Sequence, residues 1–318
     1  MEARSDRKRS QPDALETKWC ALKLLITGAS GLYGSKLAEL ALRKGHEVYS
    51  GFSRDQPRTG VPLQFDVSSE KQVEDAFKKT RPEVVVHAAS MTDVDKCETN
   101  KELAWRVNIE GTRIVTEQAA KTGAFMMYIS TDYVFNGEKG LYTETDTPDP
   151  VNQYGITKLK AENTIKELID DFCIARPCVI YGATPAAGKI NFALWLINKL
   201  RNKEKANIVT DQWITPTLNT NLADMTLEIA ERRLSGVYHV SGATRLSRYE
   251  YAEIVAKVFE FDSNLIVPVK STEMHWTAKR PRDSSLDTSK AQKALRNKPL
   301  TINEALKQLK QELAASFC

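Results

Sequence analysis

A glycine-rich turn near the start of the chain constrains the fold more than any other feature of the sequence. The apolar run Leu22–Ile26 before it is typical of a buried parallel strand, and Leu32–Lys44 after it has leucines at helical spacing. The turn, residues 27–34, reads TGASGLYG. Glycines at this spacing allow a tight turn, close approach of backbone N–H groups to a pyrophosphate, and close packing of the helix on the strand. In this context they predict a dinucleotide-binding unit; elsewhere they would be a chance turn.

Strands and helices alternate along the first 180 residues. Beyond the segments already named, we expect strands at Glu47–Phe52, Leu63–Phe65, Glu83–His87, Phe125–Ser130 and Cys173–Ile180, and helices at Ser69–Lys79, Cys97–Thr122 and Gln153–Asp171. This order predicts an α/β fold with a Rossmann-type doubly wound parallel sheet and helices on both faces.

The pattern becomes looser after Gly182, where prolines and polar loops separate shorter elements. We expect helices at Leu218–Arg233, Ser247–Glu260 and Thr301–Leu313, and a strand at Gly236–Val240. The sequence therefore predicts an NAD(P)-binding Rossmann domain over residues 21–176. It predicts a smaller mixed α/β C-terminal substrate lobe over residues 177–318, with some of its elements returning to the Rossmann sheet.

Residues 1–20 differ from the rest of the chain. They are polar, mixed in charge and without the apolar region of a signal peptide, so they read as a disordered leader. In the alternative reading, the basic triplet Arg7–Arg9 is a targeting patch or a contact for an acidic partner.

Composition excludes several classes of function. The 318 residues carry a formal net charge of +4, and no apolar stretch approaches 18 residues. Neither nucleic-acid binding nor a membrane span is therefore expected. The five cysteines are odd in number and form no C-x-x-C pair, and the four histidines are scattered. We expect no disulfide framework, no metal site, and a reducing, cytoplasmic setting.

The end of the second strand bears on the choice of cofactor. Sites specific for NAD usually place an acidic residue there for the ribose 2′-hydroxyl, whereas this chain has Ser53 and Arg54. An arginine at this point can hold a 2′-phosphate. We therefore expect NADPH as the cofactor, with NADH as the alternative if Arg54 is only a solvated loop residue.

Tyr154 and Lys158 are four residues apart in an expected helix and so share one face of it. A lysine charge within about 5 Å would stabilise a phenolate by roughly 3 kcal/mol, which lowers the tyrosine pKa by about two units. Such a pair could exchange protons near neutral pH. The plain alternative is an ordinary exposed pair of side chains, which any helix can carry.

Further motifs resemble those of the extended short-chain dehydrogenase/reductase superfamily. They are the glycine turn, the Y-x-x-x-K pair, Asp66-Val67, His87–Ser90, Asn108 and the segment Tyr128–Phe135. Within the superfamily the chain resembles the dTDP-4-dehydrorhamnose reductase family. The segments that carry this closer resemblance are Ser130–Phe135, Pro150–Gly155, Asp211-Gln212, Thr215–Thr217, Gly236–Gly242 and Arg280–Asp287.

The resemblance implies roles for individual residues. Tyr154 would donate the proton, Lys158 would orient the nicotinamide ribose, and Thr131 would hydrogen-bond the reacting oxygen, so these three are the expected catalytic residues. The residues expected to bind the cofactor are Gly28, Ser30, Gly31, Leu32, Tyr33, Gly34, Ser53, Arg54, Asp66, Val67, Ala88, Ala89, Ser90, Asn108, Tyr154 and Lys158. Those expected to bind the substrate are Asp132, Tyr133, Thr215 and Arg280. Local alternatives stay open: Asp66 as a turn former, Thr131 as a strand-end cap, Arg280 as a surface residue.

One pair of residues favours reduction over elimination. Related dehydratases carry an Asp-Glu pair after the threonine, whereas here Asp132 is followed by Tyr133. The resemblance thus implies reduction of the 4-keto group of a nucleotide-linked 6-deoxy sugar, of the dTDP-4-dehydrorhamnose to dTDP-rhamnose type. The expected partner is the nucleotide sugar, with a homodimer as a further expectation. The alternative is an NADP-binding regulatory subunit resembling the β subunit of methionine adenosyltransferase.

Overall fold

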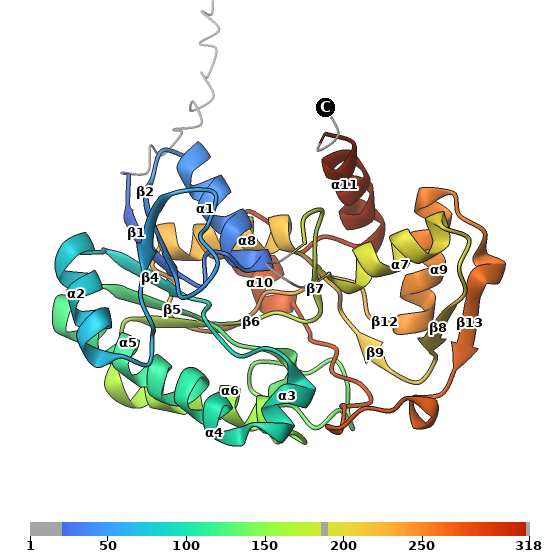
Figure 1. Ribbon diagram of the computed structural model, residues 1–318, viewed down its shortest axis with the longest axis horizontal. Helices are drawn as coiled ribbons and strands as arrows, with labels where there is room; N and C mark the ends of the chain where they lie inside the picture. Colours follow the sequence, from blue (N-terminus) through green and yellow to red (C-terminus); the bar gives the residue numbers. More distant parts are fainter. Residues whose placement is uncertain (1–20, 186–189, 316–318) are drawn as a thin grey trace, which may run out of the picture.

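The computed structural model describes residues 21–185 and 190–315, and the larger of its two parts is built around a seven-stranded parallel sheet (Figure 1). The expected leader, residues 1–20, lies outside the described residues. The strand order is β11-β6-β5-β4-β1-β2-β3. The strands are β1 Lys23–Thr27, β2 Glu47–Phe52, β3 Val61–Gln64, β4 Val84–His87, β5 Phe125–Ile129, β6 Phe172–Arg176 and β11 Gly236–His239. All neighbours pair in parallel, which confirms the predicted doubly wound α/β sheet.

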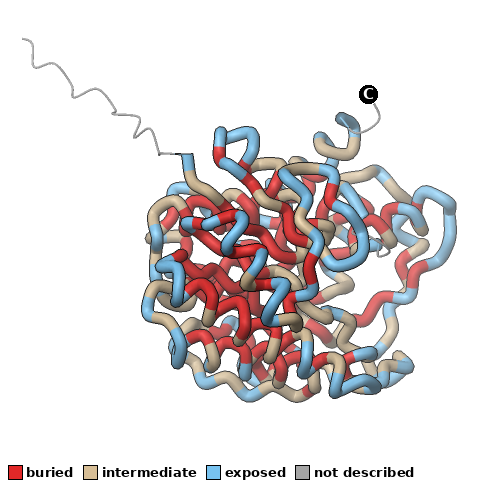
Figure 2. The backbone as a smooth tube through the Cα atoms, turned by 60° about the vertical axis from the view of Figure 1, so that its left-hand side comes forward, coloured by how far each residue is buried: buried red, intermediate tan, exposed pale blue. Residues whose placement is uncertain are grey.

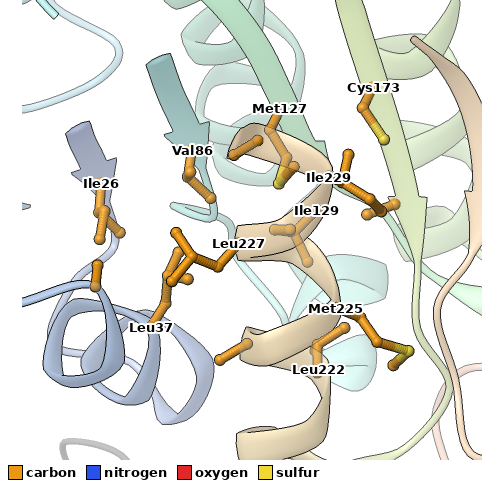
Figure 3. Packing of buried hydrophobic residues seen from close by; sticks show 14 of the residues in the cluster. Ile26, Leu37, Val86, Met127, Ile129, Cys173, Leu222, Met225, Leu227 and Ile229 are labelled. Carbon is orange, nitrogen blue, oxygen red and sulfur yellow. The ribbon is translucent and has the colours of Figure 1, made fainter. Parts of the chain in front are cut away.

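Helices cover both faces of this sheet. One face carries α1 (Leu32–Arg43), α8 (Asn219–Glu231) and α10 (Ser289–Ala294), and the other carries α2 (Glu70–Thr80), α5 (Gly111–Thr122) and α6 (Gln153–Leu168). Alternate strand residues point to opposite faces. In β1, Leu24 and Ile26 therefore pack under α1 and α8, and Leu25 packs towards α2 and α5. Figure 3 shows Leu227 of α8 among side chains from the strands and α1.

The smaller lobe has its own apolar core. Figure 2 shows that buried stretches of backbone run through the described part of the molecule. Its helices are α7 (Phe192–Arg201), α9 (Arg248–Phe259) and α11 (Ile302–Ala315). Its strands form three two-stranded pairs: β7 (Ile180–Tyr181) with β10 (Thr217–Leu218), β8 (Ala206–Val209) with β13 (Ile266–Val269), and β9 (Trp213–Ile214) with β12 (Leu246–Ser247). The chain crosses between the two parts more than once, because α8 and β11 follow the first lobe elements and pack in and on the large sheet.

The expected single helix Cys97–Thr122 is wrong. The chain instead forms α3 (Val94–Thr99), α4 (Lys101–Trp105), a π-helical turn at Arg106–Glu110, and then α5. Asn100 separates the first two helices, because its side chain accepts a hydrogen bond from the N–H of Leu103 and so caps the new helix. A π turn widens the helix by one residue and is often found at functional sites.

The expected strand Cys173–Ile180 is also interrupted. β6 ends at Arg176 because the next residue, Pro177, has no N–H to continue the ladder. Val179 then adopts a positive φ of 39°, and the chain leaves the large sheet for β7. The other elements agree with expectation apart from their ends: β3 begins at Val61, and α6 ends at Leu168.

Two results concern what the described residues do not contain. None of their helices is both long and apolar enough to cross a membrane. Within residues 21–185 and 190–315, no three His, Cys, Asp or Glu side chains are grouped so that they could hold a metal ion.

Candidate active site

The glycine turn between β1 and α1 forms a cradle that a side chain would fill. Gly28 has a φ of +69°, and a Cβ atom there would lie 2.8 Å from the backbone N of Ala89. Gly31 precedes α1, and no side chain caps the helix at this end. Uncapped N–H groups at a helix N-terminus attract phosphate. The turn therefore fits the pyrophosphate of a dinucleotide, and its contact with Ala89 brings the end of β4 to the same place.

The side chain of Tyr33, the second residue of α1, lies against α8 and not in the glycine cradle. Its hydroxyl is 2.8 Å from Thr226 Oγ1 of α8, and its ring is buried. The carbonyl of Leu32 likewise accepts a hydrogen bond from Asn219 Nδ2, at 3.0 Å. The Tyr33 side chain therefore belongs to the packing of α1 on α8, and a role for it towards a cofactor is limited to its main chain.

The ends of β2 and β3 carry the other residues expected near the adenosine. Ser53 and Arg54 follow β2 and are exposed. Asp66 follows β3, and its Oδ1 accepts hydrogen bonds from the backbone N and the hydroxyl of Ser68, at 2.9 and 2.8 Å. Val67 beside it is buried. These residues lie at the carboxyl ends of parallel strands, the edge where open α/β sheets bind ligands. Asp66 shapes its own turn here.

Asn108 lies in the π turn and connects three parts of the site. Its Oδ1 accepts hydrogen bonds from Ser90 Oγ and Met91 N, at 2.9 and 2.8 Å. Its Nδ2 donates to the carbonyl of Met91 and to Thr157 Oγ1 of α6, the latter at 3.0 Å. The extra residue of the π turn thus places a fully bonded amide between the end of β4 and the helix that carries Tyr154 and Lys158.

His87, the last residue of β4, is buried in a one-directional chain of hydrogen bonds. The N–H of Ala89 donates to Thr27 Oγ1, which is 2.7 Å from His87 Nδ1. His87 Nε2 is 3.0 Å from Thr112 Oγ1, which donates to the carbonyl of Asn108. This pattern assigns the ring proton to Nε2. Burial lowers the pKa of His87 to about 3, so the ring is neutral.

Tyr154 stands in the first turn of α6. Asn152 caps this helix, because its Oδ1 accepts a hydrogen bond from the N–H of Gly155, at 2.9 Å. Burial raises the pKa of Tyr154 above its ordinary value, and a hydrogen bond with Thr131 acts in the opposite direction. The phenol therefore holds its proton. This differs from the expectation that Lys158 would lower the Tyr154 pKa, since burial outweighs any such effect.

Thr131 and Asp132 follow the end of β5 and are both buried. The Thr131 hydroxyl donates to Asp132 Oδ1, at 3.0 Å, and accepts from the N–H of Tyr133, at 3.1 Å. Asp132 Oδ2 accepts from Cys178 Sγ, at 3.1 Å. Burial raises the pKa of the Asp132 carboxyl, and its bonds with neighbouring hydroxyl and thiol groups oppose the rise. Asp132 therefore positions the Thr131 hydroxyl beside Tyr154.

Lys158 is buried one turn further along α6. Its Nζ donates to the carbonyl of Ile129, at 2.7 Å, and lies 4.1 Å from the centre of the Tyr128 ring. Burial lowers the pKa of Lys158 to about 7, and Glu162 works against this shift. The ammonium group can therefore gain or lose its proton near neutral pH.

The residues expected to bind the substrate are not all brought together. The Tyr133 ring meets the Tyr154 ring edge-on, with centroids 6.1 Å apart. Arg280 Nη2 is 2.9 Å from Asp95 Oδ2, so its guanidinium is already in an ion pair. Thr215 is fully buried, with its hydroxyl 3.1 Å from Ser241 Oγ inside the lobe. Tyr133 is thus beside Tyr154, whereas the Thr215 hydroxyl lies in the interior of the lobe.

Three buried residues beside the site were not predicted from the sequence. Ser130 Oγ donates to Glu162 Oε1, at 2.5 Å, and Arg176 forms two hydrogen bonds with the Glu162 carboxylate. Glu162 lies four residues after Lys158, so the regular spacing of Tyr154, Lys158 and Glu162 along one helix face could have revealed it. No sequence signal identifies Arg176 as its partner, because that contact depends on how α6 packs on the sheet.

Comparisons with known proteins agree with this geometry. The family described as "RmlD substrate binding domain" matches residues 22–315. The "Probable low-salt glycan biosynthesis reductase Agl14" of Haloferax volcanii is 31% identical over 284 residues, which cover 88% of this chain and 95% of that protein. The methionine adenosyltransferase 2 subunit beta of Xenopus tropicalis is 32% identical over 278 residues, 85% of this chain and 82% of that protein.

A solved structure extends the likeness to three dimensions. The crystal structure of dTDP-4-dehydrorhamnose reductase from Bacillus anthracis in complex with NADP has a TM-score of 0.83 and 29% identity, and the match covers 92% of this chain and 99% of that one. The resemblance inferred from the sequence motifs is confirmed. This chain belongs to the RmlD substrate binding domain family, within the extended short-chain dehydrogenase/reductase superfamily.

Proposed function

We propose that this protein reduces the 4-keto group of a nucleotide-linked 6-deoxy sugar with NADPH. The observation that carries the proposal is the pairing of a protonated Tyr154 with Thr131 at the same sheet edge as the glycine cradle. A reductase needs a proton donor at the carbonyl oxygen, and a phenol with a raised pKa keeps its proton until it transfers it. Relatives named as reductases, from Haloferax volcanii and Bacillus anthracis, support the reaction class.

The residues of this chain have separate tasks in this reaction. Bound NADPH supplies the hydride. Tyr154 donates its proton to the sugar O4. The Thr131 hydroxyl, which donates to Asp132 Oδ1 here, would turn its proton to the same oxygen when the substrate binds. Lys158 binds the nicotinamide ribose and, when charged, stabilises the phenolate that remains. Tyr133 occupies the place of a dehydratase glutamate, so no second carboxylate is present there to remove a proton from carbon.

NADPH is favoured over NADH by the residues after β2. Ser53 and Arg54 are exposed, and neither is acidic. The glycine turn and the uncapped start of α1 would hold the pyrophosphate, and Arg54 would meet the 2′-phosphate. The related Bacillus anthracis structure contains NADP, which supports the same choice.

A regulatory subunit is the second candidate. The observation that favours it is the 32% identity with the methionine adenosyltransferase 2 subunit beta of Xenopus tropicalis. Under this reading the dinucleotide site would be kept, and Tyr154 would have no substrate.

One experiment separates the two candidates. Purified protein is mixed with NADPH and a dTDP-4-keto-6-deoxyhexose, and absorbance at 340 nm is followed, with Tyr154→Phe as the matched control. Catalytic oxidation of NADPH by the wild-type protein alone supports the reductase. A folded wild-type protein that binds NADPH and turns over no nucleotide keto-sugar supports the regulatory subunit.

A further inference from the structure

Glu162 is a buried carboxylate beside the site that the mechanism above does not use. It lies on α6, which runs across one face of the sheet (Figure 1), two turns after Tyr154 and one turn after Lys158. Its Oε1 accepts from Ser130 Oγ, at 2.5 Å, and from Arg176 Nε, at 2.9 Å; its Oε2 accepts from Arg176 Nη2, at 2.5 Å. The side chain is fully buried. Both of its partners come from the carboxyl ends of neighbouring strands.

These contacts hold two consecutive residues at the end of β5. Lys158 Nζ binds the carbonyl of Ile129, and Glu162 binds the hydroxyl of Ser130. The next residue is Thr131, which hydrogen-bonds Tyr154. Two side chains of α6, one turn apart, therefore fix the segment that carries Thr131 relative to the helix that carries Tyr154. A displacement of about 1 Å between such groups can lower a rate about a hundredfold.

Arg176 forms a buried ion pair with Glu162. The guanidinium is buried, lies 5.2 Å from the centre of the Phe135 ring, and has its Nη1 3.4 Å from His239 Nε2. Burial and the nearby guanidinium lower the pKa of His239 to about 3, so His239 is neutral and brings no second charge. A buried ion pair is weak evidence for stability, because apolar residues of similar volume in its place often stabilise the folded protein at least equally. Glu162 also accepts a hydrogen bond from Ser130, the residue before Thr131, so the pair has a second role in positioning Thr131.

We propose that Glu162 is a positioning residue of the active site, which anchors Ser130 to α6 and sets its negative charge beside Lys158. As far as turnover is concerned, this inference rests on the proposed function. Its effect on Lys158 can be measured without any sugar.

Among the groups around Lys158, Glu162 has the largest effect in raising the Lys158 pKa. The groups that face Lys158 are Glu162 and Tyr154 from α6, Cys97 from α3, His87 from β4 and Tyr128 from β5. His87 is neutral, and burial raises the pKa of both tyrosines. Two groups raise the Lys158 pKa, Glu162 with the larger effect and Cys97 with the smaller, so Glu162 contributes most of the charge that favours the ammonium form. Its removal should let Lys158 lose its proton at a lower pH.

The test compares four variants. Glu162→Gln keeps the shape of the side chain and removes its charge. The double variant Glu162→Gln with Arg176→Met also removes the cation that would otherwise stay buried and unpaired. Ser130→Ala removes the anchor and leaves the ion pair intact. Glu228→Gln is the control, because Glu228 is a buried carboxylate on α8 that accepts from Arg296 N, far from Tyr154 in the fold.

NADPH affinity is measured by fluorescence from pH 5.5 to 9. In the wild-type protein we expect affinity to fall as Lys158 loses its proton, with a midpoint near 7. In Glu162→Gln and in the double variant the midpoint should move down by about one pH unit or more. In Ser130→Ala and Glu228→Gln it should stay in place. A folded double variant with the wild-type midpoint would overturn the role of the charge.

Turnover tests the anchor. At pH 6 the Ser130→Ala protein should lose about tenfold or more in kcat with little change in the sugar KM, since the loss is one of alignment. Glu228→Gln should lower the melting temperature and leave kcat unchanged. Wild-type turnover in Ser130→Ala would overturn the anchoring role. A wild-type protein inactive on every keto-sugar would contradict the proposed function instead, and the NADPH midpoints would still decide the role of Glu162.

Discussion

The Tyr154 hydroxyl is the group on which the proposed chemistry depends. We expect Tyr154→Phe to lower turnover at least about a hundredfold, the scale of general acid catalysis, because phenylalanine has no proton to give. NADPH affinity should change little, since Lys158 and the glycine turn remain. Stopped-flow and equilibrium fluorescence measure the two quantities. The matched control is Tyr251→Phe, which removes a hydroxyl buried in the lobe. Normal sugar reduction by Tyr154→Phe would remove the catalytic role.

Lys158 sets the expected pH dependence. Its pKa is lowered to about 7, so the ammonium charge is lost as the pH rises through about 7. The Tyr154 pKa is raised, so that group stays protonated over the same range. The value of kcat/KM for NADPH reports groups of the free enzyme and should therefore fall above pH 7. A plateau that extended to pH 9 would show that the Lys158 charge is not required.

We expect Arg54 to decide between the two nicotinamide cofactors. We expect Arg54→Ala to raise the NADPH KM more than about tenfold, a loss of about 1.4 kcal/mol for one phosphate contact. NADH lacks the 2′-phosphate, so its KM serves as the internal control and should hardly change. Initial rates with both cofactors give the comparison, and equal effects on the two would contradict the assignment.

At the scale of elements, the π turn of Arg106–Glu110 is where structure departs most from sequence. Asn108→Ala removes an amide bonded to Ser90, Met91 and Thr157, and leaves buried groups unpaired. We expect the free energy of unfolding to fall by about 1–3 kcal/mol, measured in urea. Asn108→Asp retains the two accepted bonds but sets a buried carboxylate oxygen against the Met91 carbonyl, so its loss should be at least as large. An Asp variant as stable as the wild-type protein would argue against this account of the bonds.

Local patterns predicted the elements that depend on neighbours in the chain. β1, the glycine turn and α1 were predicted correctly, because a short apolar run, glycine spacing and leucine periodicity are all contained in residues 22–44. The split of Cys97–Thr122 was missed, since a polar Asn100 inside a helical pattern does not by itself show that it caps a new helix.

The features of the candidate site that were not predicted from the sequence depend on contacts between distant segments. Arg280 pairs with Asp95, and Arg176 with Glu162, through packing that spacing along the chain does not encode. The raised Tyr154 pKa was missed for a related reason, because desolvation depends on every layer of atoms around the phenol.

At the scale of the whole molecule, two of its buried histidines contribute to its response to acid. The pKa values of His87 and His239 are both lowered to about 3, whereas an unfolded histidine titrates near 6.5. Between these values the unfolded chain binds more protons than the folded one, so stability falls as the pH falls. Each histidine should contribute about 1.4 kcal/mol per pH unit over this window.

Urea unfolding at pH 6.5, 5.5 and 4.5 measures this slope. His87→Asn should reduce the slope by the contribution of one histidine, about 1.4 kcal/mol per pH unit, even though the variant is less stable at every pH. His275 is exposed, so His275→Asn is the control and should leave the slope unchanged. An unchanged slope in His87→Asn would show that this ring takes up a proton while folded.

The return of α8 and β11 to the large sheet has a consequence for synthesis on the ribosome. β6 is complete at Arg176, but its outer neighbour β11 ends at His239, and α8 and α10, which cover one face, end at Glu231 and Ala294. While the intervening chain is being made, the β6 edge has no partner strand and can pair with another nascent chain. The nucleotide-binding half therefore lacks β11, α8 and α10 until residue 294 has been made. Truncation after residue 176 would leave the same strand edge open permanently.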